Sequence, residues 1–143
     1  MAKVNAYLTF NGNCEQAFSF YKTVFGGEFL TFSTFRDMPP MKGIEFPETA
    51  KEKIMHVSLP ISKETILMGS DANPMFGDIA IGQNISLSVS AESKEEAEKI
   101  FKSLAAGGKI TMPIGDTFWG AYFGMLVDQF SNIWMVNFDY PKK

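Results

Sequence analysis

The chain has 143 residues, of which 45% are hydrophobic, and it carries a formal net charge of −3 at pH 7. This length suits one compact domain, or two small halves that share a core. Its basic residues are scattered, whereas a face that binds nucleic acid needs them clustered, so the composition argues against a nucleic-acid partner.

The same composition indicates a cytoplasmic protein. One cysteine allows no intramolecular disulfide, which favours a reducing compartment. The amino terminus lacks a basic-then-apolar leader, and no run approaches the roughly 18 apolar residues of a membrane span. The 14 Phe and 9 Met predict a large, irregular apolar interior, which is either a plain core or the wall of a ligand cavity.

The first half begins with a strand and a helix. Alternating residues predict a strand over 4–10. Asn13 is a suitable N-cap, with Gln16 at the reciprocal capping-box position, for a helix from Cys14 to about Phe25. Gly26 and Gly27 end this helix because glycine permits a left-handed cap.

Three further strands are predicted over 28–35, 54–60 and 65–68. Residues 36–53 are rich in Pro and Gly, and connections of this length are usually lids, binding loops or mobile segments. Residues 71–83 show no periodicity, and we predict that they link two modules.

The pattern then repeats. A strand over 84–90 precedes a helix over 94–106, for which Ser93 is the N-cap and Glu96 completes the capping box. Gly107 and Gly108 end the helix. The remaining predictions are strands over 109–112, 121–127 and 132–138, a loop over 113–116, a strand end over 117–119 and a hairpin turn over 128–131.

The two helical segments align at an offset of 80 residues. Ala17 matches Ala97, Tyr21 matches Phe101, and each helix ends at a glycine. Such a repeat predicts an α+β fold of tandem βαβββ modules, over 1–70 and 84–143. We expect one structural domain with a cupped, mixed and antiparallel arrangement of eight strands and one helix per module.

Several motifs make this chain resemble a known family. It is similar to the vicinal oxygen chelate superfamily, which has the glyoxalase and bleomycin-resistance fold, and within it to the PhnB-like branch, also labelled as the 3-demethylubiquinone 3-methyltransferase type. The motifs are YLTFNGN at 7–13, FYKTVFGG at 20–27, LMGSD at 67–71, GGK at 107–109, DTFWG at 116–120, FGM at 123–125, DQF at 128–130 and WM at 134–135. They fix a fold and a branch rather than a reaction.

The resemblance implies a divalent metal held by His, Gln and Glu on the first and fourth strands of each module. Those positions fall on Ala6, on Ser86 or Asn84, on Met135 and within 66–68, where Ile, Leu and Met stand. None is a good ligand for the hard or borderline ions of this chemistry. We therefore expect neither a metal site of the usual kind nor a bound cofactor, although a rearranged divalent site remains the alternative.

His56 is the only histidine, and it cannot build a His-rich metal site alone. It is either a hydrogen-bonded structural residue or the first candidate for acid–base catalysis near neutral pH. Cys14 stands in the first turn of the first helix, where a buried apolar role is favoured over a reactive thiolate.

The candidate ligand-binding residues surround Gly120. Asp116, Phe118, Trp119 and Tyr122 form an aromatic wall with one carboxylate, suited to a polar, partly planar ligand. Equally, the aromatic side chains belong to the core and Asp116 caps a turn. Asp71 is a further candidate, although its Gly-Ser-Asp context also fits a turn.

Two functions remain open on this sequence. The first is a metal-free module that binds a small molecule in an aromatic cleft, and the resemblance implies that it forms a homodimer. The second is an isomerase, lyase or dioxygenase-like enzyme that uses His56 or a rearranged metal site with Asp71 or Asp116. A methyltransferase activity has the least support, since no glycine-rich nucleotide loop precedes a ribose-binding acid.

Overall fold

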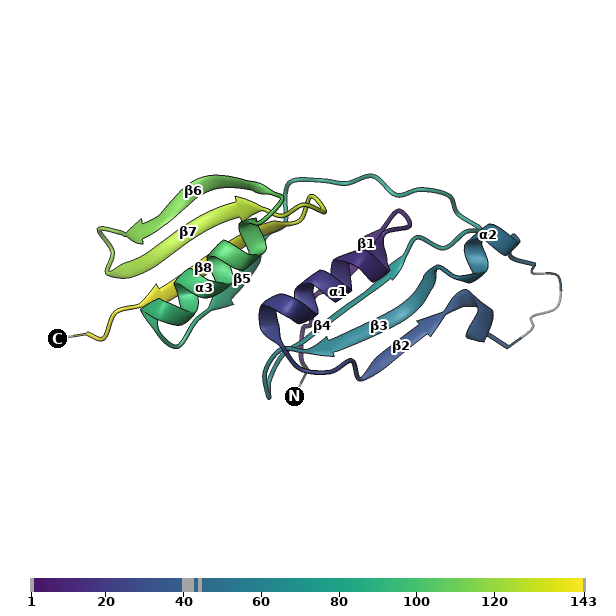
Figure 1. Ribbon diagram of the computed structural model, residues 1–143, viewed down its shortest axis with the longest axis horizontal. Coiled ribbons are helices and arrows are strands. Elements are labelled where there is room, and N and C mark those ends of the chain that lie inside the picture. The colour runs from purple at the N-terminus through teal and green to yellow at the C-terminus, as the bar shows by residue number, and fades with distance from the viewer. Residues whose placement is uncertain (1, 40–42, 44, 143) are drawn as a thin grey trace. The chain divides into compact units, whose positions relative to one another are not determined.

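The computed structural model describes residues 2–39, 43 and 45–142, and it divides the chain into two compact units, 1–80 and 81–143. Figure 1 shows both units. Within the described residues, eight strands in two mixed sheets and three α-helices confirm the α+β class. The first unit extends beyond the predicted module boundary at residue 70 to include most of the predicted linker.

The first unit contains a four-stranded sheet in the order β1-β4-β3-β2. Strand β1 runs parallel to β4, and the other neighbours are antiparallel. Helix α1 lies against one face of this sheet (Figure 1). The elements are β1 (Tyr7–Phe10), α1 (Cys14–Phe25), β2 (Thr31–Thr34), the 3-10 helix η1 (Phe35–Asp37), α2 (Glu48–Lys51), β3 (Ile54–Pro60) and β4 (Ile66–Asp71).

The second unit repeats this topology. Its sheet has the order β5-β8-β7-β6, again with one parallel pair, between β5 and β8. Helix α3 packs on β7 and β8. The elements are β5 (Leu87–Ser90), α3 (Lys94–Ala105), β6 (Lys109–Asp116), β7 (Ala121–Val127) and β8 (Ile133–Asp139). Helices α1 and α3 have equal length at an offset of 80, so the predicted repeat is confirmed.

Each helix approaches its sheet over a glycine. In the first unit, a Cβ atom on Gly69 would lie 2.6 Å from a ring carbon of Phe18. In the second unit, a Cβ atom on Gly124 would lie 2.7 Å from a ring carbon of Phe101. Both aromatic side chains are buried on the inner face of their helix. The missing glycine side chains therefore let each helix pack closely against its strands.

The cap of α1 differs from the prediction. The Asn13 side chain makes no capping hydrogen bond. Instead, Oδ1 of Asp71, at the end of β4, accepts hydrogen bonds from the backbone N–H groups of Gly12 and Cys14, each at 3.0 Å. The cap of α3 agrees better, because the Ser93 hydroxyl accepts from the Glu96 N–H at 3.0 Å. The Glu96 carboxylate accepts from the N–H of Glu92 rather than from that of the N-cap.

Several strand limits also differ. The first strand begins at Tyr7 rather than at residue 4, where Val4 is fully exposed. Strand β6 continues through the predicted loop at 113–116, because two register shifts accommodate Pro113 at the edge of the sheet. Residues 117–119 belong to a turn and not to a strand.

The predicted hairpin turn over 128–131 is confirmed. The buried Asp128 carboxylate accepts hydrogen bonds from the N–H groups of Phe130 and Asn132 and from the indole N–H of Trp134, at 2.8–3.0 Å. Ser131 adopts a φ of 73°, a left-handed conformation that is uncommon outside glycine. One buried carboxylate thus holds the β7–β8 connection together.

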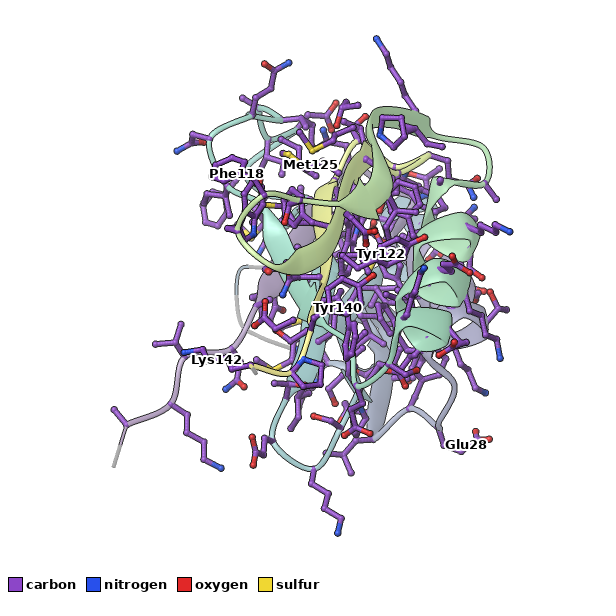
Figure 2. All side chains as sticks on the ribbon, turned by 90° about the vertical axis from the view of Figure 1, so that its left-hand side faces the viewer. Glu28, Phe118, Tyr122, Met125, Tyr140 and Lys142 are labelled. Carbon is purple, nitrogen blue, oxygen red and sulfur yellow. The ribbon has the colours of Figure 1, made fainter. Side chains whose placement is uncertain are left out.

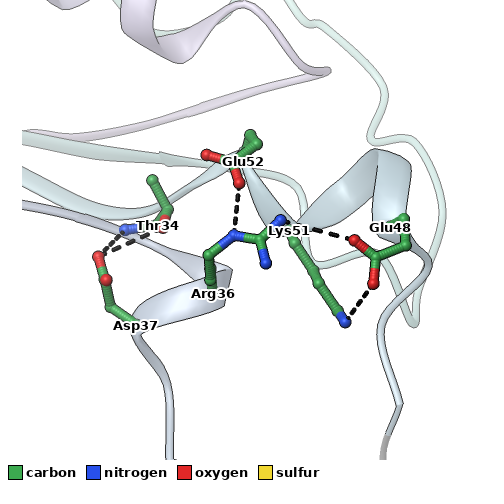
Figure 3. A network of polar contacts seen from close by, with 6 residues as sticks. All are labelled: Thr34, Arg36, Asp37, Glu48, Lys51 and Glu52. Atoms are coloured by element: carbon green, nitrogen blue, oxygen red, sulfur yellow. Dashed lines mark hydrogen bonds and ion pairs between the residues drawn. The ribbon is translucent and has the colours of Figure 1, made fainter.

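Part of the long 36–53 segment is ordered by ion pairs. Arg36, in η1, contacts Glu52 at 2.5 Å and Glu48, in α2, at 3.5 Å (Figure 3). Lys51 contacts Glu48 at 2.7 Å, and this hydrogen bond is the main cause that lowers the Glu48 pKa. Lys51 is half-buried and the other groups are exposed, so each pair adds little stability alone, yet together they connect η1 to α2. The described residues contain no helix long and apolar enough to span a bilayer.

Candidate functional site

The face of the first sheet opposite α1 carries polar and thioether side chains from three strands. Gly69 faces α1, so its neighbours Met68 and Ser70 point to the opposite side. Strand β1 pairs in register with β4, which places Tyr7 beside Met68 and Thr9 beside Ser70. Hydroxyl and thioether groups from two strands therefore share one surface.

His56 lies on the same face, because the adjacent Val57 is buried and pairs with Gly69. Its Nδ1 atom lies 3.2 Å from the Tyr7 hydroxyl, and the two rings stack with centroids 5.7 Å apart. When Tyr7 donates to Nδ1, the proton of a neutral imidazole sits on Nε2. The geometry gives His56 a partner that fixes its ring, which suits either of the two predicted roles.

A pocket of about 320 Å³ lies at the ends of β1 and β4. Its walls are mostly apolar, and Thr9 and Ser70 add hydroxyl groups. Met55 reaches it from β3, at a register shift where Ser33 pairs with His56 but Thr34 pairs with Ile54. Such a bulge redirects a side chain. The lining residues are Thr9, Phe35, Met38, Met55, Ser70, Asp71, Ala72, Asn73, Phe76, Gly77, Asp78 and Ile79.

Asp71 borders this pocket, but its carboxylate is engaged by the backbone. Besides the bonds to Gly12 and Cys14, its Oδ2 atom accepts from the N–H of Ile54 at 2.8 Å. The side chain is 4% exposed. Asp71 therefore joins β4, α1 and β3, and its predicted contact with a ligand stays a prediction.

The four candidates around Gly120 do not gather on one face of the second sheet. Tyr122 pairs with Asp116 and faces α3, where its hydroxyl donates to Glu98 at 2.6 Å. Trp119 instead packs against Phe123, which points to the opposite face, and Phe118 is 97% exposed. Figure 2 shows Tyr122 on the α3 side and Phe118 and Met125 on the other. Their ligand-binding role stays a prediction.

The four side chains around Gly120 lie apart because of a local turn. The Thr117 hydroxyl accepts from the N–H of Ala121 at 3.1 Å and donates to its carbonyl at 2.9 Å. Gly120 adopts a φ of 88°. This tight turn projects Phe118 and Trp119 beyond the strands, whereas Asp116 and Tyr122 stay in register within them.

Two tyrosine–carboxylate pairs lie on the α3 side of the second sheet. The hydrogen bond to Glu98 is the main cause that raises the pKa of Tyr122 to about 12. The Tyr140 hydroxyl donates to Asp116 at 2.5 Å, and this bond chiefly raises the Tyr140 pKa to about 12. Lys94 lies 4.9 Å from the centre of the Tyr122 ring. Both phenols therefore act as neutral donors at neutral pH.

The positions implied for a metal do not fit a hard divalent ion. The Ala6 carbonyl accepts from the N–H of Met68, and Met135 pairs with Ser88 and Met125, so these positions offer methyl, thioether and hydroxyl groups. Thioethers suit soft ions such as Cu(I). Within the described parts of the chain, no group of three or more His, Cys, Asp or Glu converges to hold an ion.

Cys14 is completely buried, and burial, followed by the nearby Asp71 and Glu15 charges, raises its thiol pKa far above the ordinary value. This agrees with an inert core residue. Sequence reasoning missed Thr9, Ser70, Met55 and Phe76 as pocket residues. A signal existed only for Thr9 and Ser70, which are hydroxyl residues in two predicted strands and alternate with buried or half-buried neighbours.

Comparison with known proteins places this fold in a family. The family model described as the Glyoxalase/Bleomycin resistance protein/Dioxygenase superfamily matches residues 3–136. Protein YjdN of Escherichia coli K12 is 35% identical over 143 residues, covering 94% of this chain and 93% of its own.

Solved structures agree. Protein PA1353 from Pseudomonas aeruginosa is 41% identical, with a TM-score of 0.84 and coverage of 97% of this chain and 98% of its own. A protein from Bacillus cereus described as a putative 3-demethylubiquinone-9 3-methyltransferase, PhnB, is 26% identical, with a TM-score of 0.73 and coverage of 96% and 99%. At 9% identity, the fosfomycin resistance protein FosX from Listeria monocytogenes, solved with Mn(II) and sulfate, shares the fold, with a TM-score of 0.62 and coverage of 97% and 93%. The chain therefore belongs to the Glyoxalase/Bleomycin resistance protein/Dioxygenase superfamily.

Proposed function

We propose that this protein binds a small, largely apolar molecule in the pocket at the ends of β1 and β4, and that it does so without the metal implied for its superfamily. The observation that carries this proposal is the pocket itself. Its volume of about 320 Å³ lies in the range of small-molecule sites, and its apolar walls carry two hydroxyl groups for orientation.

The residues at the expected metal positions support the metal-free part of the proposal. Ala6 has no donor atom in its side chain, and Met68 and Met135 offer only thioether sulfur. Elemental analysis of purified protein tests this directly. We expect no divalent metal in stoichiometric amount, and one zinc, nickel or manganese ion per chain would contradict the proposal.

The binding part is tested by filling the pocket. Ser70 lines it, so Ser70→Phe places a ring in the space a ligand needs. Ser90, an exposed serine at the end of β5, provides the control Ser90→Phe. We expect the fluorescent apolar probe N-phenylnaphthylamine to saturate the wild type and the control at one site per chain. Ser70→Phe should abolish that binding, and unchanged binding in Ser70→Phe would refute the proposed site.

One observation favours an enzymatic alternative. The stacked and hydrogen-bonded His56–Tyr7 pair provides an oriented imidazole on the face that carries Thr9 and Ser70. A divalent ion that raises the melting temperature of the wild type, but not that of His56→Ala, would support a rearranged metal-dependent site. The absence of any such difference favours the binding function.

We also propose that the protein is a cytoplasmic homodimer. Unpaired sheet edges and exposed apolar residues such as Ile110 and Met112, which are 49% and 44% exposed, favour self-association. Sedimentation equilibrium checks this, and a monomer at every accessible concentration would contradict it.

A further inference from the structure

The loop that forms one side of the pocket is fixed at both ends. Before it, the N–H of Ala72 donates to the Phe10 carbonyl at 2.6 Å. After it, Asn11 and Ile79 form a reciprocal pair, in which the Asn11 amide donates to the Ile79 carbonyl at 3.0 Å and accepts from its N–H at 2.8 Å. We call residues 73–78, between these anchors, the pocket loop.

Phe76 lies near the middle of the pocket loop, and the bonds around it are local. The Phe76 N–H donates to the Asn73 carbonyl at 2.9 Å, and Gly77 turns the chain with a φ of 74°. Phe76 lines the pocket, yet its side chain is 83% exposed. An aromatic side chain that is this exposed at the wall of a pocket would bury much of its apolar surface by covering a ligand.

The charges around the pocket disfavour an anion. No lysine or arginine is among the described lining residues, and Asp78 adds an exposed carboxylate. Two nearby features attract anions, and both are already engaged: the Asp71 carboxylate accepts N–H groups at the amino terminus of α1, and the Lys53 ammonium, which is not part of the lining, donates to the Gly12 carbonyl at 3.1 Å. A negatively charged ligand would enter an apolar space beside two carboxylates, with no cationic side chain among the described lining residues.

We infer that the pocket selects ligands that are largely apolar and either uncharged or positively charged, and that Phe76 covers the bound molecule. This inference rests on the proposed function, since it names the ligand class of the same pocket. A pocket with this preference would not bind a phosphonate, a sulfate or another oxyanion.

Two probes with one skeleton test the charge requirement. N-phenylnaphthylamine is uncharged, and anilinonaphthalene sulfonate adds one negative group to the same rings. In fluorescence titrations of the full chain, the dissociation constant of the sulfonate should exceed that of N-phenylnaphthylamine by about tenfold or more, because the apolar site cannot solvate the negative group. Asp78→Asn should reduce the ratio of the two dissociation constants by roughly two- to threefold. The effect is modest because that carboxylate is exposed. Equal affinity for both probes would overturn the charge requirement.

Two variants of the pocket loop test the cover. Phe76→Ala should weaken N-phenylnaphthylamine binding by about tenfold, mainly through faster dissociation. Met75→Ala is the matched control, because Met75 is an exposed apolar neighbour that does not line the pocket. The probe should also slow hydrogen exchange within 73–78. Equal effects of the two substitutions, or unchanged hydrogen exchange in the pocket loop, would overturn the proposal that Phe76 covers the bound molecule.

The outcomes separate this inference from the function on which it rests. If Ser70→Phe removes binding of both probes but their affinities are equal, the pocket stands and the charge requirement fails. If neither probe saturates, or if both bind unchanged to Ser70→Phe, the proposed function fails and the inference fails with it.

Discussion

Asp71 is the side chain whose replacement should destabilise the first unit most clearly. Its two oxygens accept three backbone N–H groups, from Gly12, Cys14 and Ile54, at 2.8–3.0 Å. Asp71→Ala leaves those donors without their acceptor, and the Cys14 and Ile54 bonds are buried. An orphaned buried donor costs about 1–3 kcal/mol, so the loss in free energy of unfolding should reach about 3–5 kcal/mol.

Conservative and control variants sharpen this expectation. Asp71→Asn keeps one carbonyl oxygen but turns an N–H group toward at least one backbone donor, so we expect a loss of about 2 kcal/mol. Asp116→Ala removes an exposed carboxylate that accepts a hydrogen bond from the Tyr140 hydroxyl, and it should cost less than about 1 kcal/mol.

Urea unfolding followed by circular dichroism measures all three variants. Both tryptophans, Trp119 and Trp134, lie in the second unit, so their fluorescence reports on that unit separately. An Asp71→Ala variant within about 1 kcal/mol of the wild type would refute the idea that this carboxylate joins β4, α1 and β3.

Three further expectations concern other parts of the chain. Gly124→Ala should lower the free energy of unfolding by about 2–3 kcal/mol, because its Cβ would meet neighbouring atoms at 2.7–2.9 Å. Gly115→Ala, whose Cβ would have nothing within 4 Å, should be nearly neutral, and equal urea midpoints for the two variants would contradict this. The pKa of Tyr122 is raised, so the stabilisation from its bond to Glu98 should be present below about pH 10 and lost as pH rises through about 12. The late component of tyrosinate absorbance should shrink in Tyr122→Phe but not vanish, because Tyr140 also ionises near pH 12, and an unchanged titration would count against the pairing. Cys14 should react with thiol reagents only after unfolding, and rapid reaction in the native protein would show that its burial is wrong.

Periodicity predicted the elements that depend on local signals. Helix α1 was predicted over the residues it occupies because the 3.6-residue apolar spacing and the closing glycines agree. Strands β3 and β7 were likewise predicted correctly. Strand β6 was cut short because Pro113 reads as a breaker, whereas an edge strand with register shifts tolerates a residue that has no N–H.

The site was harder to predict because its geometry depends on distant pairing. Asp71 looked like a turn residue, yet its partners are 17 to 59 positions away in the sequence. Met55 enters the pocket through a bulge between β2 and β3, which depends on the register of two strands and not on either sequence alone. The aromatic residues predicted to form one wall around Gly120 lie on two faces of the sheet, because a tight turn stands between them.

A crystal structure of the protein with bound N-phenylnaphthylamine tests the central claim most directly. We predict that the probe lies against Thr9, Met55 and Ser70, that Phe76 covers it, and that no ion is coordinated near Ala6 or Met135. A probe bound elsewhere, or a metal ion held at those two positions, would contradict the account.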